Sequence, residues 1–123
     1  MRALSVEMTR ITAEEYELLG FFEVEPKLLD KDSPWIYNDS VYEVIDGNRL
    51  MTVAIQPSYK DVRVILSEQG DKLFEFEAAG IKDVRVLNEK KHKFLEIVVS
   101  KSQSVLIKRK PHISIYIAAN EDT

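Results

Sequence analysis

One five-residue string occurs twice in the sequence, and its spacing limits the folds open to the chain. KDVRV occupies positions 60–64 and 82–86, and each copy leads through a polar stretch into a second apolar run, at 72–77 and 93–98. Short apolar runs on both sides of a polar turn are typical of a β-hairpin, and self-similarity at a fixed period indicates a repeated unit. The chain is therefore predicted to be built from hairpins of about 22 residues.

Four such hairpins follow one another from residue 40 onward. They join 41–45 to 50–56, 62–66 to 73–78, 84–88 to 94–99, and 105–109 to 113–118. In the first of them, a two-residue turn at positions 47 and 48 would pair Val44 with Met51 and Tyr42 with Val53. The expected fold is mainly β (α+β), an antiparallel meander whose sheet either curls around its core or closes like a barrel.

The N-terminal third adds a helix, a short extra strand and a long segment without a period. Thr12 and Glu15 have the spacing of a capping box, which predicts a short helix over about 13–19. Residues 21–25 read as a short strand, stopped by a proline that suits an edge position. The expected organisation is a single domain, 1–123, with an irregular segment at 27–39, the hairpin meander at 40–118 and a disordered tail at 119–123.

Alternation along the strands separates an apolar core face from a charged outer face. On the outer face Glu77 is expected between Arg63 and Arg85, within ion-pair reach of at least one of them, and Glu96 opposite Lys108. Such cross-strand pairs contribute only about 0.2 to 1 kcal/mol each. Their expected role is to fix the register of the strands.

The first hairpin departs from this pattern, because its second face is apolar too. Val41, Ile45, Leu50 and Ala54 fall on that face. The N-terminal helix is the expected cover. A second copy of the chain, forming a homodimer, is the alternative.

Composition and charge exclude several classes of protein. The chain has no cysteine, so it has neither a disulfide framework nor a thiolate metal site. No apolar run approaches the roughly 20 residues of a membrane helix, and glutamates interrupt the first twenty residues where a signal peptide would need an apolar stretch. Residues 1–59 hold 5 Lys/Arg against 11 Asp/Glu, and this acidic front half argues against general nucleic-acid binding, which needs a dominant basic patch. A cytoplasmic protein without contact to membranes is expected.

No catalytic, metal or cofactor motif is present. The two histidines, His92 and His112, each lie beside lysine or arginine, which disfavours a metal site. There is no Gly-x-Ser-x-Gly turn and no phosphate-cradling glycine-rich loop. The chain is accordingly expected to bind no cofactor and not to be an enzyme.

Two stretches remain as candidate functional surfaces. The first is the irregular segment with the only tryptophan, where aromatic and acidic residues stand together and would suit a basic partner: Trp35, Tyr37, Asn38 and Asp39. Trp35 could equally plug one end of the sheet. The second is a basic rim formed by hairpin loops at one end of the sheet, able to hold phosphates or an acidic protein surface: Lys90, Lys91, His92, Arg109, Lys110 and His112. Solvated turn lysines that protect strand edges are its structural alternative.

These observations favour a small soluble β domain of bacterial type that acts by protein–protein interaction. An acidic antagonist of the immunity-protein type fits the size and the charge. A small-ligand-binding β-barrel is the alternative, and it requires a closed sheet around a cavity, whereas the inward residues are large enough to fill an eight-stranded interior. An enzyme of unknown class comes third.

Overall fold

A computed structural model describes residues 10–119 of the chain. In this range, helix α2 spans Glu15–Phe22, and a short 3-10 helix, η1, spans Trp35–Tyr37. The strands are β1 (Lys27–Leu28), β2 (Ser40–Asp46), β3 (Arg49–Gln56), β4 (Asp61–Glu68), β5 (Asp71–Ala78), β6 (Asp83–Glu89), β7 (His92–Ser100), β8 (Gln103–Lys108) and β9 (Ser114–Ala119). All four predicted hairpins are therefore present.

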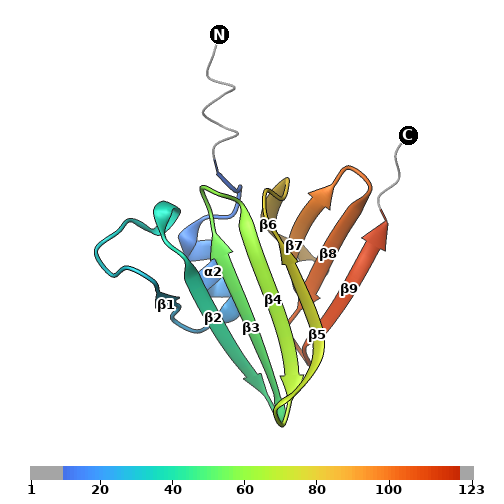
Figure 1. Ribbon diagram of the computed structural model, residues 1–123. Helices are drawn as coiled ribbons and strands as arrows, with labels where there is room; N and C mark the ends of the chain where they lie inside the picture. Colours follow the sequence, from blue (N-terminus) through green and yellow to red (C-terminus); the bar gives the residue numbers. More distant parts are fainter. Residues whose placement is uncertain (1–9, 120–123) are drawn as a thin grey trace.

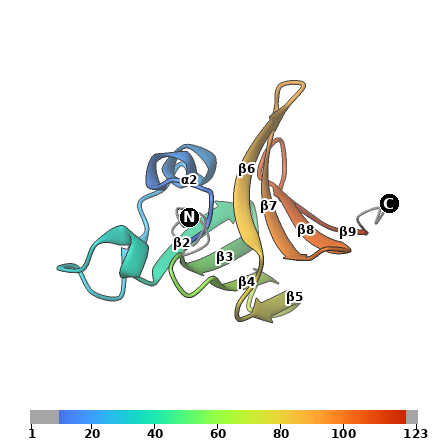
Figure 2. The ribbon, with the colours of Figure 1, turned by 90° about the horizontal axis from the view of Figure 1, so that it is seen from above.

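The meander divides into two antiparallel sheets instead of forming one curled sheet. The first has the strand order β1-β2-β3-β4-β5 and the second β6-β7-β8-β9, with the break between β5 and β6 (Figures 1 and 2). Beside this break Ile81 donates its amide to the Lys60 carbonyl at 3.0 Å, and Lys82 donates to Val98 at 2.8 Å. Within the described range the sheets do not close into a barrel, so the fold required by the ligand-binding alternative is not formed.

The predicted register is correct within the hairpins and wrong across them. Val44 faces Met51 and Tyr42 faces Val53, as the two-residue turn requires. Arg63 and Glu77 also face each other on one side of the sheet. Glu96, however, stands opposite Leu106.

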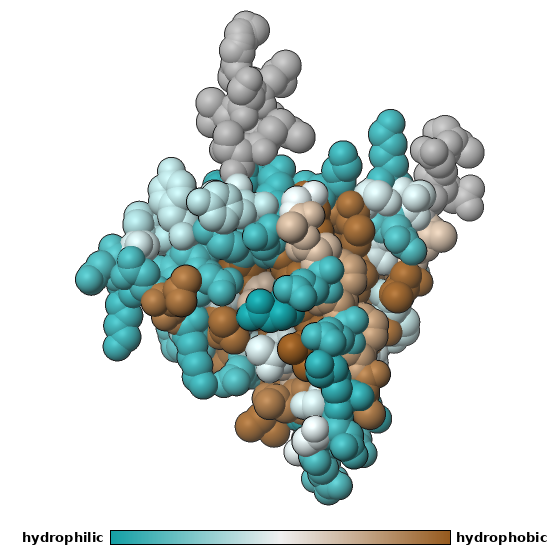
Figure 3. All heavy atoms as spheres, viewed as in Figure 1, coloured by the Kyte–Doolittle hydropathy of each residue, from teal (hydrophilic) through white to brown (hydrophobic). Residues whose placement is uncertain are grey.

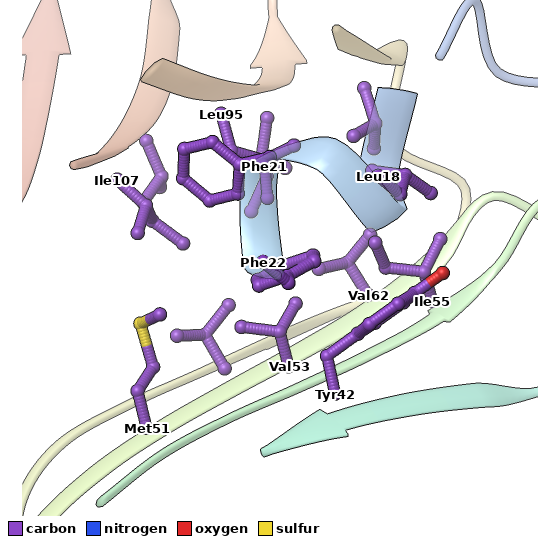
Figure 4. Close-up of a cluster of buried hydrophobic side chains, with 14 of the residues drawn as sticks. Leu18, Phe21, Phe22, Tyr42, Met51, Val53, Ile55, Val62, Leu95 and Ile107 are labelled. Carbon is purple, nitrogen blue, oxygen red and sulfur yellow. The ribbon is translucent and has the colours of Figure 1, made fainter. Parts of the chain in front are cut away.

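The core lies between the two sheets, and helix α2 fills the wedge that they leave open (Figure 2). Phe22 stacks on Tyr42 of β2 with ring centroids 4.3 Å apart, and Phe21 meets Phe22 edge-on at 5.0 Å. Figure 4 shows these rings among the aliphatic side chains of both sheets, including Val53 and Leu95. Because the helix has only eight residues, its stability depends on this packing.

The helix begins and ends later than predicted, and the expected cap is wrong. Its N-cap is Glu14, whose amide donates to the Glu17 carboxylate at 2.9 Å. Thr12 does not cap it, because its amide and hydroxyl both donate to Asp83 of β6. The strand predicted at 21–25 is wrong as well, since the two phenylalanines form the last turn of the helix and Glu23 leaves it with a positive φ of 59°. The extra strand is β1, a little further along.

The prediction that the helix covers the second face of the first hairpin is also wrong. Helix α2 packs against the inner face instead, where Tyr42 is fully buried, while Ile45 on the outer face is 76% exposed. The physical reason is that the inner face offers an aromatic partner for Phe22 and a space between two sheets. Ala54 is nevertheless buried, at 3% exposure, on the outer side.

The tail predicted to be disordered, 119–123, overlaps the described range at one residue. Ala119 is the last residue of β9, so the predicted tail begins at the end of a strand, and its residues 120–123 lie outside the described range. Between residues 10 and 119, none of the helices has the length and apolar character needed to cross a membrane.

Candidate interaction surfaces

The segment predicted to be irregular is an ordered loop, built around the side chain of Asn38. That side chain is 2% exposed, donates to the carbonyls of Ser33 (3.1 Å) and Asp30, and accepts from the Asp30 amide at 3.2 Å. Hydrogen bonds from the Ser33 hydroxyl and then the Asp32 amide lower the pKa of Asp30. Asn38 therefore holds the loop in shape and does not present its side chain to solvent.

Trp35 turns inward from this loop and packs, half-buried, against the core. Its Nε1 atom is buried together with Ser40 Oγ and Tyr42 Oη, and none of these three has a hydrogen-bond partner among the described residues. Burial raises the pKa of Tyr42 to about 12, and the Trp35 indole, which lies close to the hydroxyl without the geometry of a full hydrogen bond, lowers it by less. Because its ring contacts the core, Trp35 has a structural role whatever else it does.

Tyr37 and Tyr59 stand exposed on either side of one clamping residue, Gln56. The Gln56 amide nitrogen donates to the Tyr37 carbonyl at 3.0 Å, and its oxygen accepts from the Tyr59 amide at 2.8 Å. A backbone hydrogen bond from Ser58 to Ile36 (3.0 Å) joins the same two loops. Both rings are largely in solvent, at 63% and 72% exposure, but the backbone that carries them is fixed. Together they form what we call the tyrosine platform.

A hollow of about 290 Å³ adjoins the platform on the outer face of the first sheet. Three carboxylates line it, those of Asp39, Asp61 and Glu77, against one guanidinium, that of Arg63. Although Arg63 and Glu77 face each other, no ion pair within 4 Å joins them, and none joins Glu77 to Arg85, so that prediction is wrong. The hollow thus carries an excess of negative charge.

The basic rim is only partly gathered by the fold. A pocket of about 240 Å³ at the C-terminal end of α2 is lined by Phe21, Glu23, Lys91, His92, Lys93, Arg109 and Lys110. His112 and Lys90 do not line it: His112 approaches Asp46 at 3.7 Å with 80% of its side chain exposed, and Lys90 lies in the β6–β7 turn. Four of the six predicted rim residues therefore meet at one place.

Within the pocket the cations surround the single carboxylate. Lys110 Nζ lies 2.7 Å from a Glu23 oxygen, and Arg109 donates through Nε to the Phe22 carbonyl at 3.1 Å. The hydrogen bond from Lys110 is the main cause that lowers the pKa of Glu23, with added attraction from Arg109 and Lys93. Arg109 is thus held rigidly, while the lysines reach into solvent.

Sequence reasoning missed Tyr59, Gln56 and Asp61 on one surface, and Glu23 on the other. A tyrosine in a short polar turn was the only available signal for the first surface. Glu23 gave none, because its position depends on where the helix ends. Between residues 10 and 119 no group of three or more histidine, aspartate or glutamate side chains is arranged to hold a metal ion.

Comparison with known proteins gives a likeness of fold. No protein-family model matches the sequence, and no curated protein matches it significantly. Among solved structures, a chain of a contact-dependent growth inhibition toxin–immunity protein complex from Klebsiella pneumoniae 342 superimposes with a TM-score of 0.72 and 16% sequence identity. The superposition covers 91% of this chain and 98% of the other. The likeness therefore extends over the fold as a whole and is not confined to one hairpin.

Proposed function

We propose that this chain is an immunity-type protein, which neutralises a toxin domain by binding it and does not act as an enzyme. The observation that carries the proposal is the likeness over 91% of the chain to a component of a toxin–immunity protein complex. The net charge of −4 at this small size supports the same role, because it suits a basic partner. In this role the protein would work in the cytoplasm of the cell it protects.

The tyrosine platform and the adjoining acidic hollow are the surface that we assign to this contact. Tyr37 and Tyr59 are exposed aromatic side chains on a fixed backbone, and tyrosine is enriched among the residues that dominate interface energies. A clamped backbone also loses little conformational freedom on binding. The carboxylates of Asp39, Asp61 and Glu77 would face lysine or arginine residues of the partner. Trp35 and Asn38 support the loop from beneath.

The direct test is co-expression with the polypeptide encoded by the neighbouring gene in the source genome. If the proposal is correct, that polypeptide alone inhibits growth, the present chain restores growth, and the two purify as a complex. If instead the present chain inhibits growth by itself, it is the toxin component, and the proposal is wrong.

Paired variants locate the contact. Tyr59→Ala should weaken the complex by roughly thirtyfold, because a hot-spot aromatic contributes about 2 kcal/mol or more. Tyr16→Ala, which removes an equally exposed ring (72%) from the helix, should leave affinity unchanged. Glu77→Lys should lower the association rate, whereas Glu89→Lys, at the exposed end of β6, should not. A complex that tolerates both Tyr59→Ala and Glu77→Lys would show that the partner binds elsewhere.

A further inference from the structure

The turn between β6 and β7 places two lysines in a backbone conformation that lysine disfavours. Glu89 pairs with His92, so Lys90 and Lys91 form a two-residue turn, with φ values of 46° and 73°. Turns of this kind prefer Asn-Gly, because a side chain at positive φ is strained. The equivalent turns of the neighbouring hairpins use a glycine at one such position, Gly47 or Gly70. The chain therefore keeps a lysine at residue 91 where glycine would be more stable.

Lys91 lines the pocket at the C-terminal end of α2, so the strained turn places a cation in that pocket. Lys91 and Lys93 come from one hairpin and Arg109 and Lys110 from the next. Among the described residues that line the pocket, one carboxylate, that of Glu23, stands against these four cationic side chains. The positive charge of the pocket thus exceeds what its own residues neutralise by about three elementary charges at neutral pH.

We propose that this pocket binds a phosphate group, either free phosphate or the phosphoryl end of a small metabolite. A phosphate monoester carries about −1.5 to −2 charges at pH 7 and several acceptor oxygens, which matches the excess better than a single carboxylate does. Arg109 supplies a fixed guanidinium, whose fork suits phosphate oxygens. The volume of about 240 Å³ favours a small anion, since pockets for drug-sized ligands begin at about 300 Å³.

Glu23 then acts as an internal competitor for the cations. Its carboxylate oxygen lies 2.7 Å from Lys110 Nζ. An incoming phosphate has to share or displace this contact. Removal of the carboxylate is therefore expected to tighten binding, whereas loss of an ordinary structural ion pair would not create affinity for an anion.

Titration of the purified chain with inorganic phosphate and with glycerol phosphate, followed by calorimetry and by backbone amide NMR shifts, tests the site. Saturable binding that shifts the amides of 91–93 and 109–110 supports it. Equal affinity for the two probes identifies free phosphate as sufficient, and tighter binding of glycerol phosphate identifies a phosphorylated metabolite. Binding of neither probe at millimolar concentration overturns the proposal.

Three variants distinguish this site from general attraction to lysines. Lys91→Gly should weaken binding about tenfold, as expected for one charge-assisted contact, while raising the urea midpoint of unfolding by relieving the turn. Glu23→Gln should bind more tightly than the wild type. Lys101→Ala, an exposed lysine in the β7–β8 turn, is the matched control and should bind normally. Equal losses in Lys91→Gly and Lys101→Ala, or weaker binding by Glu23→Gln, would contradict the proposal.

Discussion

Thr12 and Asp83 form two hydrogen bonds across 71 positions of sequence. The Thr12 amide donates to one carboxylate oxygen of Asp83 at 2.7 Å, and the Thr12 hydroxyl donates to the other at 2.5 Å. The next residue, Ala13, donates its amide to the Val84 carbonyl at 2.9 Å. The segment before α2 is thereby fastened to the edge of β6 that does not face β7.

Removal of the Thr12 hydroxyl should destabilise the fold because the hydrogen bond to Asp83 is lost, and not because the helix loses its cap. Thr12→Ala should lower the free energy of unfolding by about 1 to 2 kcal/mol, because hydrogen bonds to charged groups are worth more than neutral ones. Thr12→Ser keeps the hydroxyl and should cost little. In urea denaturation a double-mutant cycle should show coupling of Thr12 with Asp83 and none with Glu15. Coupling of Thr12 with Glu15 alone would contradict this expectation and support the capping box predicted from the sequence.

Tyr42→Phe should change the free energy of unfolding by no more than about 1 kcal/mol at neutral pH, because the buried hydroxyl it removes lies close to the Trp35 indole without the geometry of a full hydrogen bond. The pH dependence follows from the raised pKa. A folded-state pKa of about 12 against an ordinary value of 10 means that the Tyr42 hydroxyl ionises first in the unfolded chain, so the stability of the fold is unaffected by it below pH 10 and falls between pH 10 and 12. Denaturation at a series of pH values should show this extra loss in the wild type and in Tyr16→Phe, but not in Tyr42→Phe.

Two cross-strand pairs of opposite charge should differ in energy, one that the sequence did not predict, Arg85 with Glu96, and one that it did, Arg63 with Glu77. Arg85 donates to Glu96 at 3.0 Å, whereas Arg63 and Glu77 form no ion pair. Double-mutant cycles to alanine should give a coupling of about 0.5 to 1 kcal/mol for the first pair and about zero for the second. High salt should reduce the first value. A larger coupling for Arg63 with Glu77 would contradict the described geometry.

Trp35→Ala and Tyr37→Ala separate support of the loop from recognition. Trp35 packs against the core, so its truncation should cost about 2 to 4 kcal/mol of unfolding free energy. Tyr37 is 63% exposed, and its truncation should leave the thermal midpoint nearly unchanged while weakening the complex. An unchanged midpoint for Trp35→Ala would show that its core contacts carry little energy.

The sequence was sufficient to locate the hairpins, because their signals are local. Alternation and turn residues placed β2 to β9 and paired Val44 with Met51. The break between β5 and β6 has no such signal, since it depends on how the segment around Ile81 bonds to distant carbonyls. The helix shifted for a similar reason. Thr12 bonds to Asp83, a partner that no local pattern reveals.

The candidate surfaces show the same difference between residues that local sequence signals reveal and residues that only the fold brings together. Tyr37 and Asp39 could be singled out by residue type, and so could the lysines and the arginine of the pocket. Their companions Tyr59, Asp61 and Glu23 could not, because only the folded chain brings them near. Asn38 shows the opposite case, a residue chosen for recognition whose side chain serves the loop.

The fastening of residues 12 and 13 to β6 also bears on how the protein is made. During synthesis the N-terminal segment and helix α2 leave the ribosome long before β6, since 71 positions separate Thr12 from Asp83. Until β6 and β7 emerge, Phe21 has no second sheet to pack against, and the helix is too short to persist alone. The first sheet is complete in the nascent chain before its partner exists. The edge of β6 is then covered by residues 12 and 13, which were synthesised before the strands of either sheet.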